Sequence, residues 1–297
     1  MNVSMVNATF EDRKKPDFDP QQNTDHFIQK IPEYVAAGIR AFTLNLQGGM
    51  PGYEGAVNSA FDSTGALRSE YLRRVERVID FCDKIGVVVI LGCFYQRQDQ
   101  ILQDETAVIN AVKNTTRWIR KKGFSNVLLE IANEYPHRGF DHEIIRTPEG
   151  VVELIRIAKR EHPNLLVSAS GVGNGKIDSL VAETSDFILI HFNGTPISKI
   201  PERVNALKKF HKPIVCNEDD KVGKEAVHAL KMAVASGCSW GYMNNKINQY
   251  VPFEFNGVQD DTLLYQAMRR LTRPEGSRHE KGDLFNGDLQ PVKTDYL

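Results

Sequence analysis

The sequence NVLLEIANE at residues 126–134 is an apolar run that ends in an Asn-Glu pair. A second run with the same ending, PIVCNE, follows at residues 213–218. Both patterns predict short buried strands, and each delivers one glutamate at its C-terminal end. In a closed parallel barrel, the C-terminal ends of all strands meet at one mouth. The two glutamates, Glu134 and Glu218, are therefore predicted to converge.

The rest of the chain alternates amphipathic helical patterns with short β-rich runs, which indicates a parallel sheet covered by helices. Eight β-rich runs are present, at residues 3–9, 41–46, 87–94, 126–133, 165–170, 187–191, 214–218 and 239–244. Glycines that favour left-handed helix caps precede four of them, at Gly38, Gly86, Gly123 and Gly237. We predict the α/β class, with a single-domain (β/α)8 TIM barrel over residues 1–272 and a polar C-terminal tail over residues 273–297.

The charges of the chain nearly cancel, because 37 Lys and Arg residues stand against 38 Asp and Glu residues. The formal net charge of -1 creates no long-range field that would attract nucleic acid or an anionic membrane. We expect neither as a partner and expect a neutral or weakly charged substrate. A monomer is favoured, although the sequence leaves the oligomeric state open.

The cellular compartment is also left open. No stretch approaches the roughly 18 consecutive apolar residues of a membrane span, and residues 1–20 lack the pattern of a secretory leader. The first predicted strand nevertheless begins at residue 3, which is consistent with removal of an upstream leader. We expect a secreted or periplasmic protein in that case and a cytoplasmic protein otherwise. The four cysteines lie in apolar patterns without Cys-x-x-Cys spacing and are interpreted as buried free thiols.

Side-chain alternation along a strand places Glu130 on the same face as Glu134, and Cys216 on the same face as Glu218. The alternation predicts that Glu134 and Glu218 both point into the barrel mouth. Glu130 lies in mid-strand and is interpreted as a buried structural anchor that needs partners. One strand-end glutamate alone is most simply a solvated or ion-paired residue. Two at corresponding strand ends, each preceded by Asn, favour catalysis, and two convergent carboxylates suit glycosidic bond cleavage.

Long loops follow several predicted strands at the face where barrel enzymes build their sites. Their amide, imidazole and guanidinium groups suit sugar hydroxyls, and their aromatic rings offer stacking faces, although loop residues serve packing equally well. The predicted substrate-binding residues there are Asn45, Gln47, Tyr95, Arg97, His137, Asn193, Trp240, Asn244 and Asn245. The neighbouring pair Asp219 and Asp220 is expected to face solvent.

The two strand ends resemble those of the clan A glycoside hydrolases, the large (β/α)8 group that includes the cellulase-like family 5 enzymes. The resemblance covers residues 1–272 as architecture, and its specific motifs are the two strand ends. It implies that Glu134 is the acid/base and Glu218 the nucleophile. It also implies that Asn133 binds the sugar 2-hydroxyl and that His191, at the end of the sixth strand, belongs to the substrate site.

Three strand ends depart from the usual family 5 pattern. The third ends Cys93-Phe94-Tyr95 without the histidine often found there, and Asn193 stands where a tyrosine often touches the nucleophile. At the eighth, Asn244 occupies the region that usually carries a tryptophan platform. The ends of strands three, six and eight are therefore atypical for family 5.

The pairing of Glu134 with Glu218 predicts a reaction that retains configuration. Carboxyl groups about 5 to 5.5 Å apart leave no room for a water between them, so one attacks the anomeric carbon and the other protonates the leaving oxygen. Ionised Glu218 is expected to raise the pKa of Glu134 and so keep it protonated for its acid role.

No cofactor or catalytic metal is expected. Residues 142–146 lack the second histidine of a zinc-binding helix, and residues 171–177 do not match a phosphate-binding loop. Two other functions stay open on the same fold. One is a carbohydrate-binding barrel without activity, and the other is a lyase or isomerase that acts on sugar acids.

Overall fold

The computed structural model describes residues 1–15, 17–48 and 56–272, so the predicted tail at residues 273–297 lies outside the described residues. The described residues contain all eight predicted strands. They are β1 Asn2–Ser4, β2 Ala41–Asn45, β3 Val88–Phe94, β4 Val127–Ala132, β5 Val167–Ser168, β6 Ile188–His191, β7 Ile214–Glu218 and β8 Gly241–Tyr242. The first strand is shorter than predicted because the chain enters a turn after Ser4, and its partner β8 pairs with only Asn2 and Val3.

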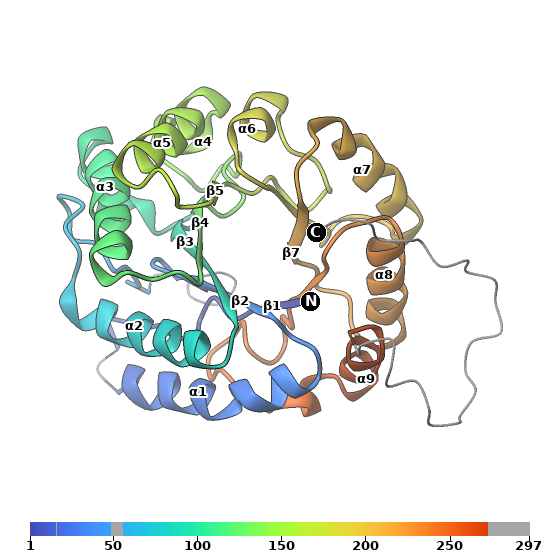
Figure 1. Cartoon of the computed structure of the whole chain (residues 1–297). Coiled ribbons are helices and arrows are strands. Elements are labelled where there is room, and N and C mark those ends of the chain that lie inside the picture. The colour runs from blue at the N-terminus through green and yellow to red at the C-terminus, as the bar shows by residue number, and fades with distance from the viewer. Residues whose placement is uncertain (16, 49–55, 273–297) are drawn as a thin grey trace.

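The strands form a ring of parallel neighbours. Six are paired in the order β5-β4-β3-β2-β1-β8, and the remaining two pair as β6-β7. Single parallel bridges close both seams, Ser170 with Leu189 beside β5 and β6, and Val215 with Ser239 beside β7 and β8. Figure 1 shows the helices arranged around these strands. The predicted (β/α)8 barrel is therefore confirmed.

The helices alternate with the strands along the chain. The longer ones are α1 Pro20–Ala36, α2 Ser69–Lys84, α3 Glu105–Lys122, α5 Pro148–Glu161, α8 Gly223–Ala235 and α9 Thr262–Leu271. The shorter helical segments are α4 Glu143–Arg146, α6 Ser179–Thr184, α7 Ile200–Leu207, η1 Asp99–Ile101, η2 Ile197–Lys199, η3 Lys208–Phe210 and η4 Gly257–Asp260. The glycines predicted as caps all have positive φ, with Gly38 at 98° and Gly123 at 72°. These left-handed residues turn each helix back toward the next strand.

The interior of the barrel has an apolar floor. Ile90, Leu128, Phe187, Leu189 and Val215 form a cluster that is separate from the main core between the strands and the helices. Strand positions two residues further toward the C-terminal ends are polar, as the side chains of Glu130 and Asn217 show. A buried polar layer therefore lies on the apolar floor, directly beneath the mouth of the barrel.

All four cysteines are buried and free, as predicted. Within the part of the chain that the structure describes, none of the helices combines the length and apolarity needed to span a membrane.

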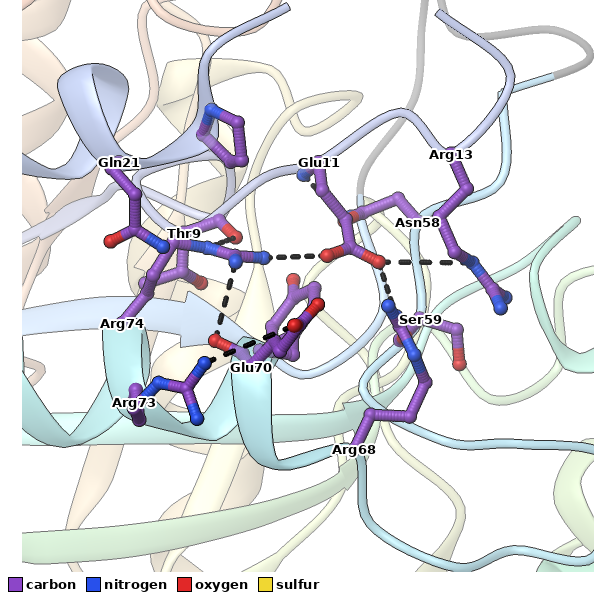
Figure 2. Close-up of polar contacts among 12 residues, drawn as sticks. Thr9, Glu11, Arg13, Gln21, Asn58, Ser59, Arg68, Glu70, Arg73 and Arg74 are labelled. Carbon is purple, nitrogen blue, oxygen red and sulfur yellow. Dashed lines mark hydrogen bonds and ion pairs between the residues drawn. The ribbon is translucent and has the colours of Figure 1, made fainter. Parts of the chain in front are cut away.

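A buried ion cluster ties the loop after β1 to helix α2 (Figure 2). The carboxylate of Glu11 accepts a hydrogen bond from Arg74 at 2.8 Å and another from Arg68, and it pairs with Arg13 at 3.7 Å. Arg74 also donates to the backbone oxygen of Thr9 at 3.3 Å. Because the side chain of Arg74 is only 2% exposed, its charge depends on Glu11 for compensation.

We predict that Glu11→Gln lowers the free energy of unfolding by roughly 3 kcal/mol, because it leaves the buried guanidinium of Arg74 without its counter-charge. Denaturant unfolding measures the change. The control is Glu161→Gln, which breaks a well-formed but exposed ion pair with Arg117 and should change stability much less. Equal effects of the two substitutions would contradict this interpretation of the cluster.

Candidate active site

The ends of β4, β6 and β7 bring two carboxylates to one imidazole. Nδ1 of His191 lies 3.2 Å from Oε1 of Glu134 and 3.7 Å from Oε2 of Glu218. The side chain of His191 is fully buried, that of Glu218 is 5% exposed and that of Glu134 is 15% exposed. The two glutamates predicted to converge therefore do so, and Glu134 is the more accessible of the pair.

Amide groups hold both oxygens of Glu218. Asn133 donates from Nδ2 to Oε2 at 3.1 Å, and Asn193 donates from Nδ2 to Oε1 at 3.0 Å. The Oδ1 atoms of these two asparagines are buried and find no hydrogen-bond partner among the described residues. Each asparagine thus orients the carboxylate with one end and offers an acceptor with the other.

The direction of Glu218 does not follow from simple alternation. Val215 and Asn217 face the inside of the barrel, since Val215 belongs to the apolar floor and Asn217 lies 3.5 Å from Glu130, whereas Cys216 packs in the outer core. The pairing of β6 with β7 is irregular, because one step from Ile190 to His191 faces two steps from Cys216 to Glu218. This bulge turns Glu218 inward as well. The prediction that Cys216 and Glu218 lie on the same face of the strand is wrong.

The backbone of Glu134 is left-handed, with a φ of 53°. Such a conformation costs a non-glycine residue about 1 kcal/mol or more and persists only where neighbouring groups hold it. The backbone N–H of Glu134 donates to Oγ of Ser170 at 2.9 Å, and that hydroxyl lies 2.5 Å from Oε1 of Glu130. Glu130 is fully buried, as the sequence predicted for an anchor. Ser170 was missed because nothing local in the sequence marks it.

The imidazole of His191 is protonated at neutral pH. Burial acts to lower its pKa, but the carboxylates of Glu218, Glu134 and Glu130 outweigh that effect and raise the pKa of His191 to about 9. A cation therefore sits between the two strand-end glutamates.

The positive charge of His191 reverses the expected order of the pKa values of Glu134 and Glu218. Burial raises the pKa of the Glu218 carboxyl, and the neighbouring Glu134 acts in the same direction. Burial also acts to raise the pKa of Glu134, but the hydrogen bond and charge of His191 outweigh it and hold that pKa below its ordinary value. The expectation that Glu218 raises the pKa of Glu134 is wrong for the free protein, because it took no account of a charged histidine at both carboxylates.

Other predicted substrate residues are distributed around this centre. The backbone N–H of His137 donates to the backbone oxygen of Glu134 at 2.7 Å. Arg97 is exposed on the neighbouring loop. Tyr95 is 4% exposed at the end of β3. The side-chain amide of Asn45 is buried, and neither its nitrogen nor its oxygen finds a partner among the described residues. These four residues keep their predicted role as a proposal.

Three other residues predicted to bind substrate make well-defined contacts inside the protein. Trp240 is fully buried, stacks on Tyr242 and donates its indole N–H to Asp219 at 2.9 Å. Gln47 is also fully buried and bonds to loop groups through both ends of its amide. Asn244 donates to the Tyr242 hydroxyl and accepts from a backbone N–H. These contacts order the loops that shape the mouth, and the predicted sugar contact of the three side chains stays a proposal.

The pair after β7 also differs from expectation. Asp219 is fully buried and accepts from Lys221 at 2.8 Å as well as from Trp240, so the prediction that it faces solvent is wrong. Asp220 accepts a hydrogen bond from Nδ2 of Asn245 at 3.0 Å. This bond engages the side-chain nitrogen of Asn245, a residue predicted to bind substrate. The loop after Glu218 is therefore fixed by its own ion pair. Among residues 1–15, 17–48 and 56–272, no group of His, Cys, Asp and Glu side chains gathers as a metal site.

The barrel has the fold of the clan A glycoside hydrolases, as comparison with solved structures shows. A broad-specificity family 5 endoglucanase from an uncultured bovine rumen ciliate superposes with a TM-score of 0.67 and 12% identity, over 92% of this chain and 95% of the other. The corresponding enzyme from Clostridium longisporum gives a TM-score of 0.63 and 12% identity, over 91% and 96% of the two chains. A family 5 lichenase from Caldicellulosiruptor sp. F32 gives 0.61 and 15%, over 92% and 93%.

No protein-family model matches the chain, and no curated protein sequence matches it. The solved structures confirm the resemblance to family 5 enzymes as a likeness of fold, which extends over almost the whole barrel.

We predict that His191 makes stability depend on pH. Its pKa of about 9 in the folded protein lies above the ordinary value of 6.5, so its contribution is complete below pH 6.5 and is lost as the pH rises through about 9. Thermal unfolding across this window should show a decline for the wild type that His191→Asn lacks. The exposed control His228→Asn should keep the decline. Parallel curves for the wild type and His191→Asn would contradict a buried imidazolium.

Proposed function

We propose that this protein is a retaining β-glycoside hydrolase in which Glu134 is the acid/base and Glu218 the nucleophile. The observation that carries the proposal is the shared contact of both carboxylates with Nδ1 of His191. In the first step, an oxygen of Glu218 attacks the anomeric carbon while the glycosidic bond breaks and Glu134 gives its proton to the leaving oxygen. In the second step, Glu134 takes a proton from water, which displaces Glu218.

The contact with His191 supports retention over inversion. The oxygens that touch Nδ1 lie 3.2 Å and 3.7 Å from it, so the sum of these distances is the greatest separation they can have. That limit admits the roughly 5 to 5.5 Å of retaining enzymes and leaves out most of the roughly 6.5 to 9.5 Å range of inverting ones.

The reaction needs a proton on Glu134 and a negative charge on Glu218, which is the reverse of their pKa order in the free protein. Substrate bound against Glu134 removes water from its partly exposed carboxyl and raises its pKa. Glu218 keeps the amide donors of Asn133 and Asn193, which favour its ionised form. Because His191 contacts both acids, the three groups titrate as one coupled set, and the proton passes within it.

The substrate class that suits this site is a neutral glycan. The buried acceptor oxygens of Asn133 and Asn193 match hydroxyl donors of a sugar at the catalytic centre. A mutant of the Caldicellulosiruptor lichenase has been solved with cellotetraose, which supports a β-linked glucan as the first substrate to test.

We predict that Glu134→Gln lowers kcat/KM by about 10²- to 10⁴-fold for glycosides with poor leaving groups, and far less for activated aryl β-glycosides that need no acid. Glu218→Gln should abolish turnover of both substrate types, because no nucleophile remains. The control Glu153→Gln, on helix α5 with a side chain that is 46% exposed, should retain wild-type rates. Hydrolysis of a panel of aryl β-glycosides and polysaccharides measures all three.

Three outcomes would overturn the proposal. Losses in Glu134→Gln that do not depend on the leaving group would remove its acid role. Glycan binding by the wild type without turnover would indicate a binding barrel. An unsaturated product that absorbs in the ultraviolet would indicate a lyase.

A further inference from the structure

A chain of polar groups runs from the buried polar layer of the barrel to the backbone of Glu134. Oε1 of Glu130 accepts from the Ser170 hydroxyl at 2.5 Å, and Oγ of Ser170 accepts from the backbone N–H of Glu134 at 2.9 Å. On the other side, Oε2 of Glu130 lies 3.5 Å from Nδ2 of Asn217. Glu130, Ser170 and Asn217 are all fully buried. Bulk water therefore does not compete for these contacts.

The Ser170 hydroxyl has a single proton, and its direction is decided by Glu130. When that proton points at a carboxylate, a lone pair of Oγ is free to face the N–H of Glu134. An ionised acceptor makes the hydroxyl hydrogen bond short and strong, and it increases the electron density that Oγ presents to the amide. Ser170 cannot turn its proton toward Glu134 without breaking its contact with Glu130.

The backbone that receives this support is the strained one. Glu134 has a φ of 53°, which is unfavourable for a residue with a side chain. The same turn aims its carboxyl at His191, while the backbone N–H groups of Tyr135 and Ser170 bond to the oxygens of Ser170 and Ala132 and fasten the two strand ends together. A small rotation at Glu134 would move its carboxyl away from both His191 and the glycosidic oxygen.

We propose that Glu130 and Ser170 are positioning residues for Glu134: the buried carboxylate fixes the direction of the Ser170 hydroxyl, which holds the left-handed turn that aims the acid/base. The kinetic consequence of this proposal rests on the proposed function. The hydrogen-bond relay, which runs from Glu130 through Ser170 to the backbone N–H of Glu134, is independent of that function.

Two charged groups, His191 at the end of β6 and Glu218 at the end of β7, act on Glu130. Burial raises the pKa of Glu130 to about 7, and Glu218 at the end of β7 acts in the same direction. The protonated His191 of β6 and the hydrogen bond from Ser170 oppose this. Glu130 therefore changes charge near neutral pH, where His191 is still protonated.

The kinetic experiment compares kcat/KM for a poor and an activated leaving group on the same sugar. Ser170→Ala should lower the value about 10- to 100-fold for the poor leaving group and only slightly for the activated one, since misplacement of the acid matters only where acid help is needed. Ser168→Ala is the matched control, because Ser168 is also fully buried on β5 and its hydroxyl bonds to the backbone oxygen of Phe187. Any change in kcat/KM that Ser168→Ala causes should be the same for the poor and the activated leaving group.

Glu130→Gln separates hydrogen bonding from charge. Its amide oxygen still accepts the Ser170 hydroxyl, and Asn217 can turn its unpartnered Oδ1 toward the new amide nitrogen. The values of kcat/KM for the two leaving groups should therefore stay close to those of the wild type in Glu130→Gln. In Glu130→Leu the acceptor is lost, and the kinetics should resemble those of Ser170→Ala.

A second measurement needs no turnover. The chemical shift of the Glu134 amide proton, followed by NMR against pH, should titrate with a midpoint near 7 in the wild type and in Ser168→Ala. That titration should vanish in Glu130→Gln and Ser170→Ala. If the wild type hydrolyses no glycoside, the proposed function fails while this titration still decides the relay. An amide shift that is unchanged by either substitution, or equal kinetic losses in Ser170→Ala and Ser168→Ala, would overturn the positioning role.

Discussion

A buried imidazolium that two carboxylates share is the interaction on which the rest of this site depends. His191 is fully buried, and a cation at such depth persists only because Glu134 and Glu218 lie beside it. The contact links the ends of three strands, so it also fixes how β4, β6 and β7 meet. The carboxylates in turn depend on the cation, because two negative charges at that spacing would repel each other in a site with little water.

The barrel supplies the conditions for that interaction through its two interior layers. The apolar floor around Ile90 and Val215 excludes water from below, and the polar layer above it supplies Asn217, Ser170 and Glu130 as hydrogen-bonding support. Where regular strand geometry would aim side chains wrongly, local irregularities correct it. A bulge turns Glu218 inward, and a left-handed turn aims Glu134.

The sequence predicted the eight strands, the glycine caps and the convergence of the two glutamates, because these follow from periodicity and from the parallel arrangement of strand ends. It did not predict the internal hydrogen bonds of Trp240, Gln47 and Asn244, since the polarity of a segment does not reveal which of its side chains order the loops. It likewise missed Ser170, whose partners Glu130 and Glu134 are distant in sequence, and the burial of Asp219, which depends on how Trp240 folds over the loop. The reversed pKa order of Glu134 and Glu218 depends on His191, which lies 57 residues from the first of them.

The most direct test of a retaining mechanism is to trap its covalent intermediate. The wild-type protein would be incubated with an activated 2-deoxy-2-fluoro glycoside of the sugar it hydrolyses and then examined by intact mass spectrometry and peptide mapping. The account predicts one added fluoroglycosyl group, located on Glu218. Turnover of ordinary glycosides without any adduct, or an adduct on Glu134, would contradict it.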